Sequence, residues 1–286
     1  MDLSQLTQLT LKDVLGFTVV GTLISTIGTF IALFLKEWVF TRSFEEWKSE
    51  RSLETVYRKY KDPILLATIE LCDRLVEICK NEHPPEFLQS EFLRGELEPP
   101  SRNSVISSYY NRYKLQSSIY RLCSLLGWLE LFRQDIVFLH SSKNKINRSF
   151  EEAVKKVRND FADGYLNNAN DWQEWCDVLI FREEQRAIGE SMITTGSNGR
   201  VVIGYGEFLQ ILTANSSSGK THWIKAATRF LIDPELTKDF RLIRMKRLIV
   251  HLVDLIEALD ASRLSNYHKK TRSIYSSITQ TSDHSS

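Results

Sequence analysis

The densest group of charged side chains that could do chemistry lies between positions 181 and 190, where the chain reads FREEQRAIGE. Arg182 and Arg186 are four residues apart, as are Arg186 and Glu190, so a helix would carry the three side chains on one face. Guanidinium groups bind carboxylates and phosphates through paired, charge-assisted hydrogen bonds. We therefore consider Arg182, Glu183, Arg186 and Glu190 a candidate site for a ligand or an anion.

Two other interpretations of this segment stay open. The charges could form a network of ion pairs that holds neighbouring helices in one register, because the segment follows Trp172 and Trp175 and contains Ile188. They could also form a solvated helix face, with no partner beyond water.

A second segment, residues 214–221, reads ANSSSGKT and matches a Walker A loop in which alanine replaces the first glycine. A working phosphate loop follows a buried strand and precedes a helix. The preceding residues, Glu207–Thr213, are more typical of a helix. We therefore do not predict a nucleotide site here.

The remaining polar residues predict no catalytic centre. The six histidines fall in no metal-ligand spacing, and neither H-E-x-x-H nor G-x-S-x-G occurs. A formal net charge of +1 gives no global attraction to nucleic acid. We predict no metal, no cofactor and no nucleic-acid partner, and we favour a non-enzymatic role.

Two groups of polar residues between positions 241 and 254 have simple interpretations. His251 and Asp254 are three residues apart and are expected to form a surface pair. Four basic residues form a patch that could touch anionic lipid or, as the favoured interpretation, face solvent: Arg241, Arg244, Lys246 and Arg247.

The element that would position these groups in the cell is Val14–Leu35, a run of 22 residues without a charge. As a helix this run is roughly 33 Å long, enough to cross a hydrocarbon core of about 30 Å. A cleaved signal peptide normally has a shorter apolar region after basic residues, and a buried helix of a globular protein normally has a polar face. We therefore predict a single transmembrane helix.

The flanks of this run predict its orientation. Lys12 is the one basic residue before it, whereas Lys36, Arg42, Lys48 and Arg51 follow it. Because basic flanks stay on the cytoplasmic side, the N-terminus is expected outside and the C-terminal domain in the cytoplasm. A row of small and hydroxyl residues lies on one face of the helix and could pack against a second helix, although the hydroxyls could instead bond to their own backbone: Thr18, Gly21, Thr22, Ser25, Gly28 and Thr29.

The rest of the chain predicts a mainly α fold. We expect a leader and anchor over residues 1–42, a cytoplasmic helical-bundle domain over 43–265, and a disordered Ser/Thr-rich tail over 266–286. The turn cluster at 196–199 also permits one small β-hairpin.

Local signals predict where several helices begin and end. Asp62 and Pro63 are typical of the start of a new helix after Ser43–Tyr60, and Ser149 has the spacing of a capping box. Gly127, within a long apolar helix of about residues 104–140, predicts a close crossing or a bend.

Four passages resemble a family of uncharacterised, N-terminally anchored helical proteins: Tyr57–Leu65, Leu126–Glu130, Phe181–Glu190 and Ile203–Tyr205. The resemblance covers most of the chain after the anchor. It implies a shared helical fold and no established activity. It also implies that the 182–190 motif is a family feature.

Together these observations predict a single-pass membrane protein that acts as a tethered interaction module: a scaffold, sensor or adaptor. Its expected partners are the lipid bilayer and another protein or a second copy of the chain. The alternative is a membrane-tethered enzyme or effector with a ligand or anion pocket around Arg182, Arg186 and Glu190.

Overall fold

The computed structural model describes nine ranges of the chain: residues 11–34, 41–80, 84–93, 106–137, 145–162, 176–197, 199–214, 219–234 and 239–260. The chain divides into two units, residues 1–54 with 139–142, and residues 55–138 with 143–286. The described part is mainly helical with one two-stranded antiparallel sheet, which confirms the predicted fold class. The predicted tail at 266–286 lies outside the described residues.

Helix α1 (Leu11–Phe34) belongs to the first unit and carries the predicted membrane span. Within it, Gly16–Phe34 is long and apolar enough to cross a bilayer, and none of this stretch is buried by the protein. It is the one such helix in the described ranges. Length and composition agree with an anchor, and its insertion and orientation stay predictions.

Helix α2 (Thr41–Cys79) is continuous through Pro63, so the predicted break at Asp62–Pro63 is wrong. A proline inside a helix removes one backbone hydrogen bond and usually bends or ends the helix. Here a buried stripe continues across the proline, from Tyr60 and Ile64 to Ala67 and Leu71. Because these side chains all pack into one core, tertiary contacts outweigh the lost hydrogen bond.

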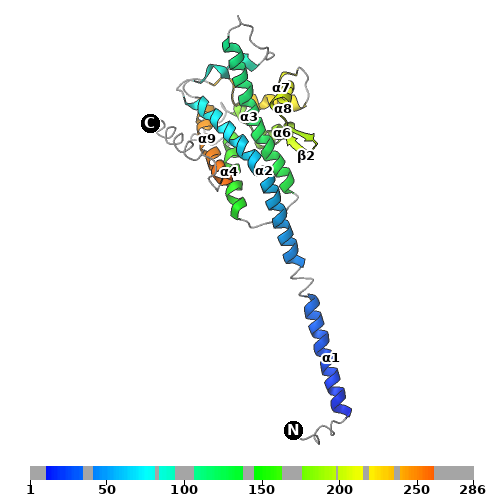
Figure 1. Ribbon diagram of the computed structural model, residues 1–286. Coiled ribbons are helices and arrows are strands. Elements are labelled where there is room, and N and C mark those ends of the chain that lie inside the picture. Colours follow the sequence, from blue (N-terminus) through cyan, green and yellow to red (C-terminus); the bar gives the residue numbers. More distant parts are fainter. Residues whose placement is uncertain are drawn as a thin grey trace, which may run out of the picture. The chain divides into compact units, whose positions relative to one another are not determined.

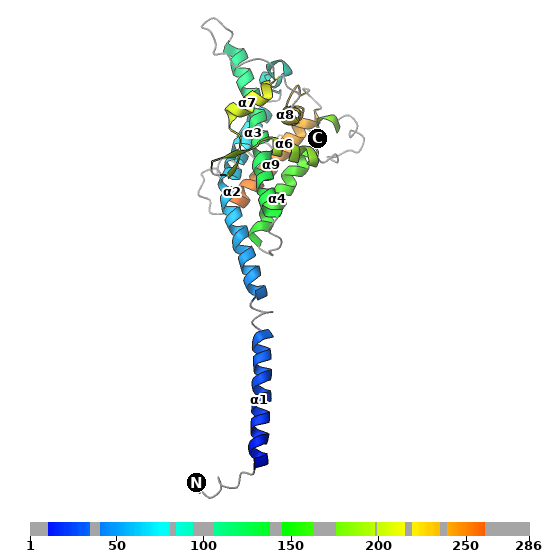
Figure 2. The same cartoon turned by 90° about the vertical axis from the view of Figure 1, so that its right-hand side faces the viewer.

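In the second unit, α2 and helix α3 (Ile106–Val137) lie side by side in both views (Figures 1 and 2). Tyr60 donates a hydrogen bond to Asp135 at 2.6 Å near one end, and Lys114 donates to Glu77 at 2.5 Å near the other. These two pairs make the helices antiparallel.

Short elements from distant parts of the chain pack against α3. They are the 3₁₀ helices η3 (Glu86–Leu88) and η4 (Ser90–Leu93), helices α6 (Arg182–Ser191), α7 (Tyr205–Thr213) and α8 (Gly219–Thr228), and strand β2 (Gly199–Val202). The 3₁₀ helix η5 (Cys176–Val178) precedes α6, and strand β1 (Ile193–Gly196) pairs with β2. The strands pair antiparallel with Gly196 opposite Gly199, which confirms the predicted hairpin. Gly199 has a φ of 108°, a conformation that favours glycine.

Of the two alternatives that the sequence left open at Gly127, a close crossing or a bend, the structure shows a close crossing. A Cβ atom at this position would lie 3.0 Å from the Cβ of Met192 and 3.1 Å from a methyl carbon of Val202. The missing side chain therefore lets the end of α6 and strand β2 pack directly on α3.

Helices α4 (Lys145–Ala162) and α9 (Phe240–Leu259) form a second pair, bright green and orange in Figure 1. Ser149 lies inside α4, so the predicted capping box is wrong about where the helix begins. An apolar stripe of α9 is buried at Met245, Ile249 and Leu252 and continues to the end of the helix.

Two predictions about the polar residues of α9 are wrong. His251 lies 2.5 Å from the buried carboxylate of Asp160 on α4, while Asp254 pairs with Lys156, so the predicted His251–Asp254 pair is wrong. The predicted basic patch is not a surface either, because Arg241 and Arg244 are buried. Asp160 and its partners instead join α4 to α9.

Candidate ligand site

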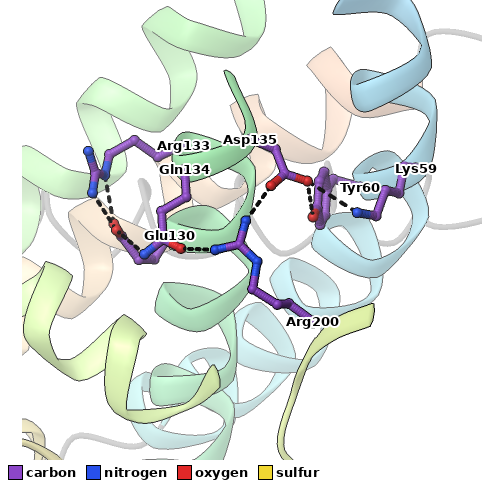
Figure 3. Close-up of polar contacts among 7 residues, drawn as sticks. All are labelled: Lys59, Tyr60, Glu130, Arg133, Gln134, Asp135 and Arg200. Carbon is purple, nitrogen blue, oxygen red and sulfur yellow. Dashed lines mark hydrogen bonds and ion pairs between the residues drawn. The ribbon is translucent and has the colours of Figure 1, made fainter. Parts of the chain in front are cut away.

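A network of polar side chains in the second unit, residues 55–138 and 143–286, is centred on α3 and not on α6 (Figure 3). Glu130 is fully buried and accepts hydrogen bonds from Arg133 at 2.5 and 2.8 Å and from Gln134 at 3.0 Å. Gln134 in turn accepts one from Arg200 of β2 at 2.5 Å. A buried carboxylate is stable only when it is paired in this way.

The second half of this network surrounds Asp135, which accepts hydrogen bonds from Tyr60 and Lys59 of α2 and from Arg200 of β2 (Figure 3). Burial acts to raise the pKa of Asp135, but the hydrogen bonds from Tyr60 and Lys59 and the charges of Lys59 and Arg200 together lower it. The stabilisation is therefore present above the ordinary pKa of an aspartate and lost as the pH falls through the lowered value. This network joins α2, α3 and the hairpin.

Helix α6 contains the charged motif of residues 182–190, and three residues of this motif have structural roles. The buried Gln185 donates to the carbonyls of Arg158 and Ile180, both at 2.9 Å. Glu184 accepts from the backbone of Phe181 at the helix start and pairs with Arg229 at 2.6 Å. Gly189 lies against α3, with room for no side chain.

The four predicted site residues separate into two pairs. Arg182 and Arg186 both line a pocket between α3, α4 and α6. Arg182 also donates to Asn159 at 2.7 Å, whereas Arg186 has no hydrogen-bond or ion-pair partner among the described residues. Glu183 and Glu190 are exposed and do not line the pocket.

The pocket has a volume of about 300 Å³. Its apolar wall comes from α3 and α4, and its charged lining comes from all three helices. The apolar residues are Leu129, Phe132, Ile136, Phe150 and Val154, and the charged ones are Arg133, Lys155, Arg158, Arg182, Arg186 and Glu151. Five cations thus face one carboxylate, a composition that attracts anions.

Arg158 is a half-buried cation of the pocket whose surroundings disfavour its charge. Its Nε is buried without a hydrogen-bond partner in the described residues. Burial lowers the pKa of its guanidinium, and the charge of Glu130 acts in the opposite sense. The charges of Arg186, Arg133 and Arg182 lower it further. An anion in the pocket would supply the opposite charge that this arginine lacks.

The cations that α3 and α4 contribute to the pocket were not predicted from the sequence. A usable signal was present on α4, where Glu151, Lys155 and Arg158 are spaced by four and three residues and so share one helix face. No such signal in the sequence links Arg133 to that face, because the two helices meet only in the folded chain.

The described part of the pocket lining consists of cations, apolar side chains and the carboxylate of Glu151. Among these described lining residues there is no histidine, cysteine, serine or tyrosine. Across the described ranges, no three His, Cys, Asp or Glu side chains are placed to hold a metal ion.

The Walker-like segment lacks the architecture of a phosphate loop. The element before it, α7, is a helix, as the sequence analysis expected, and α8 begins at Gly219. The Thr221 hydroxyl donates to the carbonyl of Ile211 on α7 at 3.4 Å. Residues 215–218 lie outside the described ranges.

On α1, three hydroxyl groups bond to their own helix. Thr22 donates to the Thr18 carbonyl at 2.9 Å, Thr26 to the Thr22 carbonyl at 2.7 Å, and Thr29 to the Ser25 carbonyl at 2.8 Å. Bonding of the hydroxyls to their own backbone is the alternative to helix–helix packing that the sequence left open. A Cβ atom at Gly21 or Gly28 would meet nothing within 4 Å.

No family model matches the chain, and neither a curated protein nor a solved structure matches it. The resemblance to uncharacterised anchored helical proteins therefore stays a prediction.

Proposed function

We propose that this chain is a single-pass membrane protein whose cytoplasmic helical body acts as a tethered interaction module of the sensor type. The signal that it reads is an anionic ligand bound between α3, α4 and α6. The observation that supports this most directly is the pocket with five cations in its lining. The apolar helix Gly16–Phe34 supports the membrane anchor.

The pocket favours a sensor over a passive scaffold. Its walls belong to three separate helices, so a ligand that contacts Arg133, Arg158 and Arg186 together would hold α3, α4 and α6 in one arrangement. Binding to one arrangement stabilises it over any other. A protein partner that contacts this arrangement would then respond to the ligand.

The anchor predicts how the full-length chain behaves on extraction. We expect it to stay in the membrane pellet in alkaline carbonate, and a variant without residues 16–34 to move to the supernatant, because about 20 apolar residues hold a helix in the bilayer. In sealed vesicles with the cytoplasmic face outward, protease should digest the C-terminal body. Release of the full-length chain by carbonate would refute the anchor, and protection of the body would reverse the orientation.

The pocket predicts a loss of anion binding on charge reversal. Full-length protein in phosphatidylcholine nanodiscs would be titrated with inorganic pyrophosphate and dodecyl phosphate by calorimetry. Arg186→Glu is expected to weaken binding by roughly 10- to 100-fold, since a hydrogen bond to a charged group contributes about 1.5–3 kcal/mol.

The matched control is Arg148→Glu. It changes the net charge of the protein by the same amount, but at a residue of α4 outside the pocket lining. The Arg148 side chain is 81% exposed and does not line the pocket. Equal loss of binding in both variants would mean that the anion responds only to overall charge. Absence of binding by both probes to the unmodified protein would overturn the sensor proposal.

A further inference from the structure

We infer that the ligand of this pocket is a single-chain anionic amphiphile, an unbranched alkyl chain that ends in a carboxylate or a phosphate. The inference rests on the proposed anion-binding function and names the class of anion. It follows from the composition of the lining, the burial of its parts and the volume of the pocket.

The apolar part of the lining is more than a bare anion needs. Leu129, Phe132 and Ile136 of α3 face Phe150 and Val154 of α4. The rings of Phe132 and Phe150 pack edge to face with centroids 5.0 Å apart, so this wall is fixed by aromatic packing. Phe132, Ile136 and Val154 are half-buried. A phosphate or pyrophosphate ion would leave these three side chains in contact with water, whereas an alkyl chain would cover them.

Burial separates the two ends of such a ligand. Leu129 and Phe150 are each 1% exposed, whereas Lys155, Arg182 and Arg186 are exposed. The alkyl chain therefore lies against the buried α3–α4 wall. The anionic group lies toward solvent among the cations, where Arg186 has no other partner in the described residues.

The volume limits the ligand to one chain. A pocket of about 300 Å³ is at the lower end of the range of roughly 300–1,000 Å³ typical of small-molecule sites. A bilayer phospholipid has two chains, and both would have to leave the membrane to enter. The ligand is therefore a free amphiphile and not a lipid of the surrounding bilayer.

The test is a homologous series. Sodium alkyl carboxylates and alkyl phosphates of six to twelve carbons would be titrated into the full-length protein in phosphatidylcholine nanodiscs, with empty nanodiscs as the reference for partitioning. Each added methylene is expected to raise the affinity about fourfold until the pocket is full. In nanodiscs that also contain an anionic two-chain phospholipid, with empty nanodiscs of the same composition as the reference, the affinity for each added amphiphile should be unchanged, because the bilayer lipid does not compete for the pocket.

Two variants distinguish the contribution of the ligand's alkyl chain from that of its anionic group. Val154→Trp fills the apolar wall and leaves every cation in place, so it should abolish the dependence on chain length. Arg186→Glu should weaken all members of the series by a similar factor. Val201→Trp is the matched control, because this half-exposed valine on β2 does not line the pocket. Should Val154→Trp fail to fold, Ile136→Trp makes the same test from α3.

The outcomes distinguish this inference from the function on which it rests. Affinity that rises with chain length and is lost in Val154→Trp supports the amphiphile. Binding of pyrophosphate or a polyglutamate peptide with no dependence on chain length would overturn the amphiphile and retain an anion sensor. Competition by the anionic bilayer lipid would also overturn it, since the source would then be the membrane. Absence of binding by every probe would overturn both proposals.

Discussion

Replacing Gly189 with alanine is expected to destabilise the protein, although the same change in an ordinary helix stabilises it by about 1 kcal/mol. A Cβ atom here would lie 2.7 Å from the backbone oxygen of Leu126 and 2.7 Å from the Cβ of Glu130, both on α3. Neither atom is the end of a flexible side chain, so α6 would have to move away from α3. Overpacking of this kind costs about 1–3 kcal/mol, and the larger Gly189→Val should cost more.

The measurement is thermal unfolding of the full-length chain in nanodiscs. A loss of this size in a domain of this length lowers the melting temperature by roughly 3–10 °C. Gly206→Ala is the control, because Gly206 also lies in a helix and a Cβ there would meet nothing within 4 Å. If Gly189→Ala melted at or above the temperature of the unmodified protein, the close approach of α6 to α3 would be refuted.

The role of Gly189 shows what the 182–190 motif could and could not predict. Its charges and their spacing indicated a helix face with two guanidinium groups, and Arg182 and Arg186 do line one pocket. Uncharged residues also hold α6 in place: Gln185 donates to the carbonyl of Arg158 on α4, and Gly189 lies against α3. Because these contacts are on other helices, nothing within the motif could reveal them.

The same limit explains which parts of the fold were predictable. The long apolar helix α3 and the hairpin turn depend on local signals and were predicted, and the close crossing at Gly127 was one of two alternatives that this glycine indicated. The continuity of α2 through Pro63 was not, because it depends on a core that residues from α3 and α4 complete. Local preferences favoured a break, and tertiary packing outweighed them.

The part of the pocket lining that α6 contributes was predictable from the sequence, and the part from α3 and α4 was not. Sequence spacing can place side chains on one face of one helix, which is how Arg182 and Arg186 were grouped. Arg133 and Arg158 come from two other helices, and only folding brings them beside α6. Glu183 and Glu190, which the spacing made equally plausible, lie on the outer side of the helix.

Glu130→Gln is expected to lower stability and to strengthen anion binding. The buried carboxylate of Glu130 accepts two hydrogen bonds from Arg133 and one from Gln134 (Figure 3). Glutamine keeps the shape but loses the charge and one acceptor, so the free energy of unfolding should fall by about 1.5–3 kcal/mol. The Glu130 charge also favours the charged form of Arg158, against the neighbouring arginines. Without it, the positive field in the pocket increases, and an anion should bind severalfold more tightly.

The opposite signs make this variant decisive. General loosening of the body would lower the melting temperature and weaken ligand binding together, whereas removal of a competing negative charge lowers one and raises the other. Melting and dodecyl phosphate titration would be measured on the same nanodisc sample. Glu152→Gln is the control, since this carboxylate is 61% exposed, pairs with an exposed arginine, and lies outside the pocket lining; it should change stability by less than about 0.5 kcal/mol. Weaker binding in Glu130→Gln would contradict the expectation that the Glu130 charge opposes anion binding in the pocket.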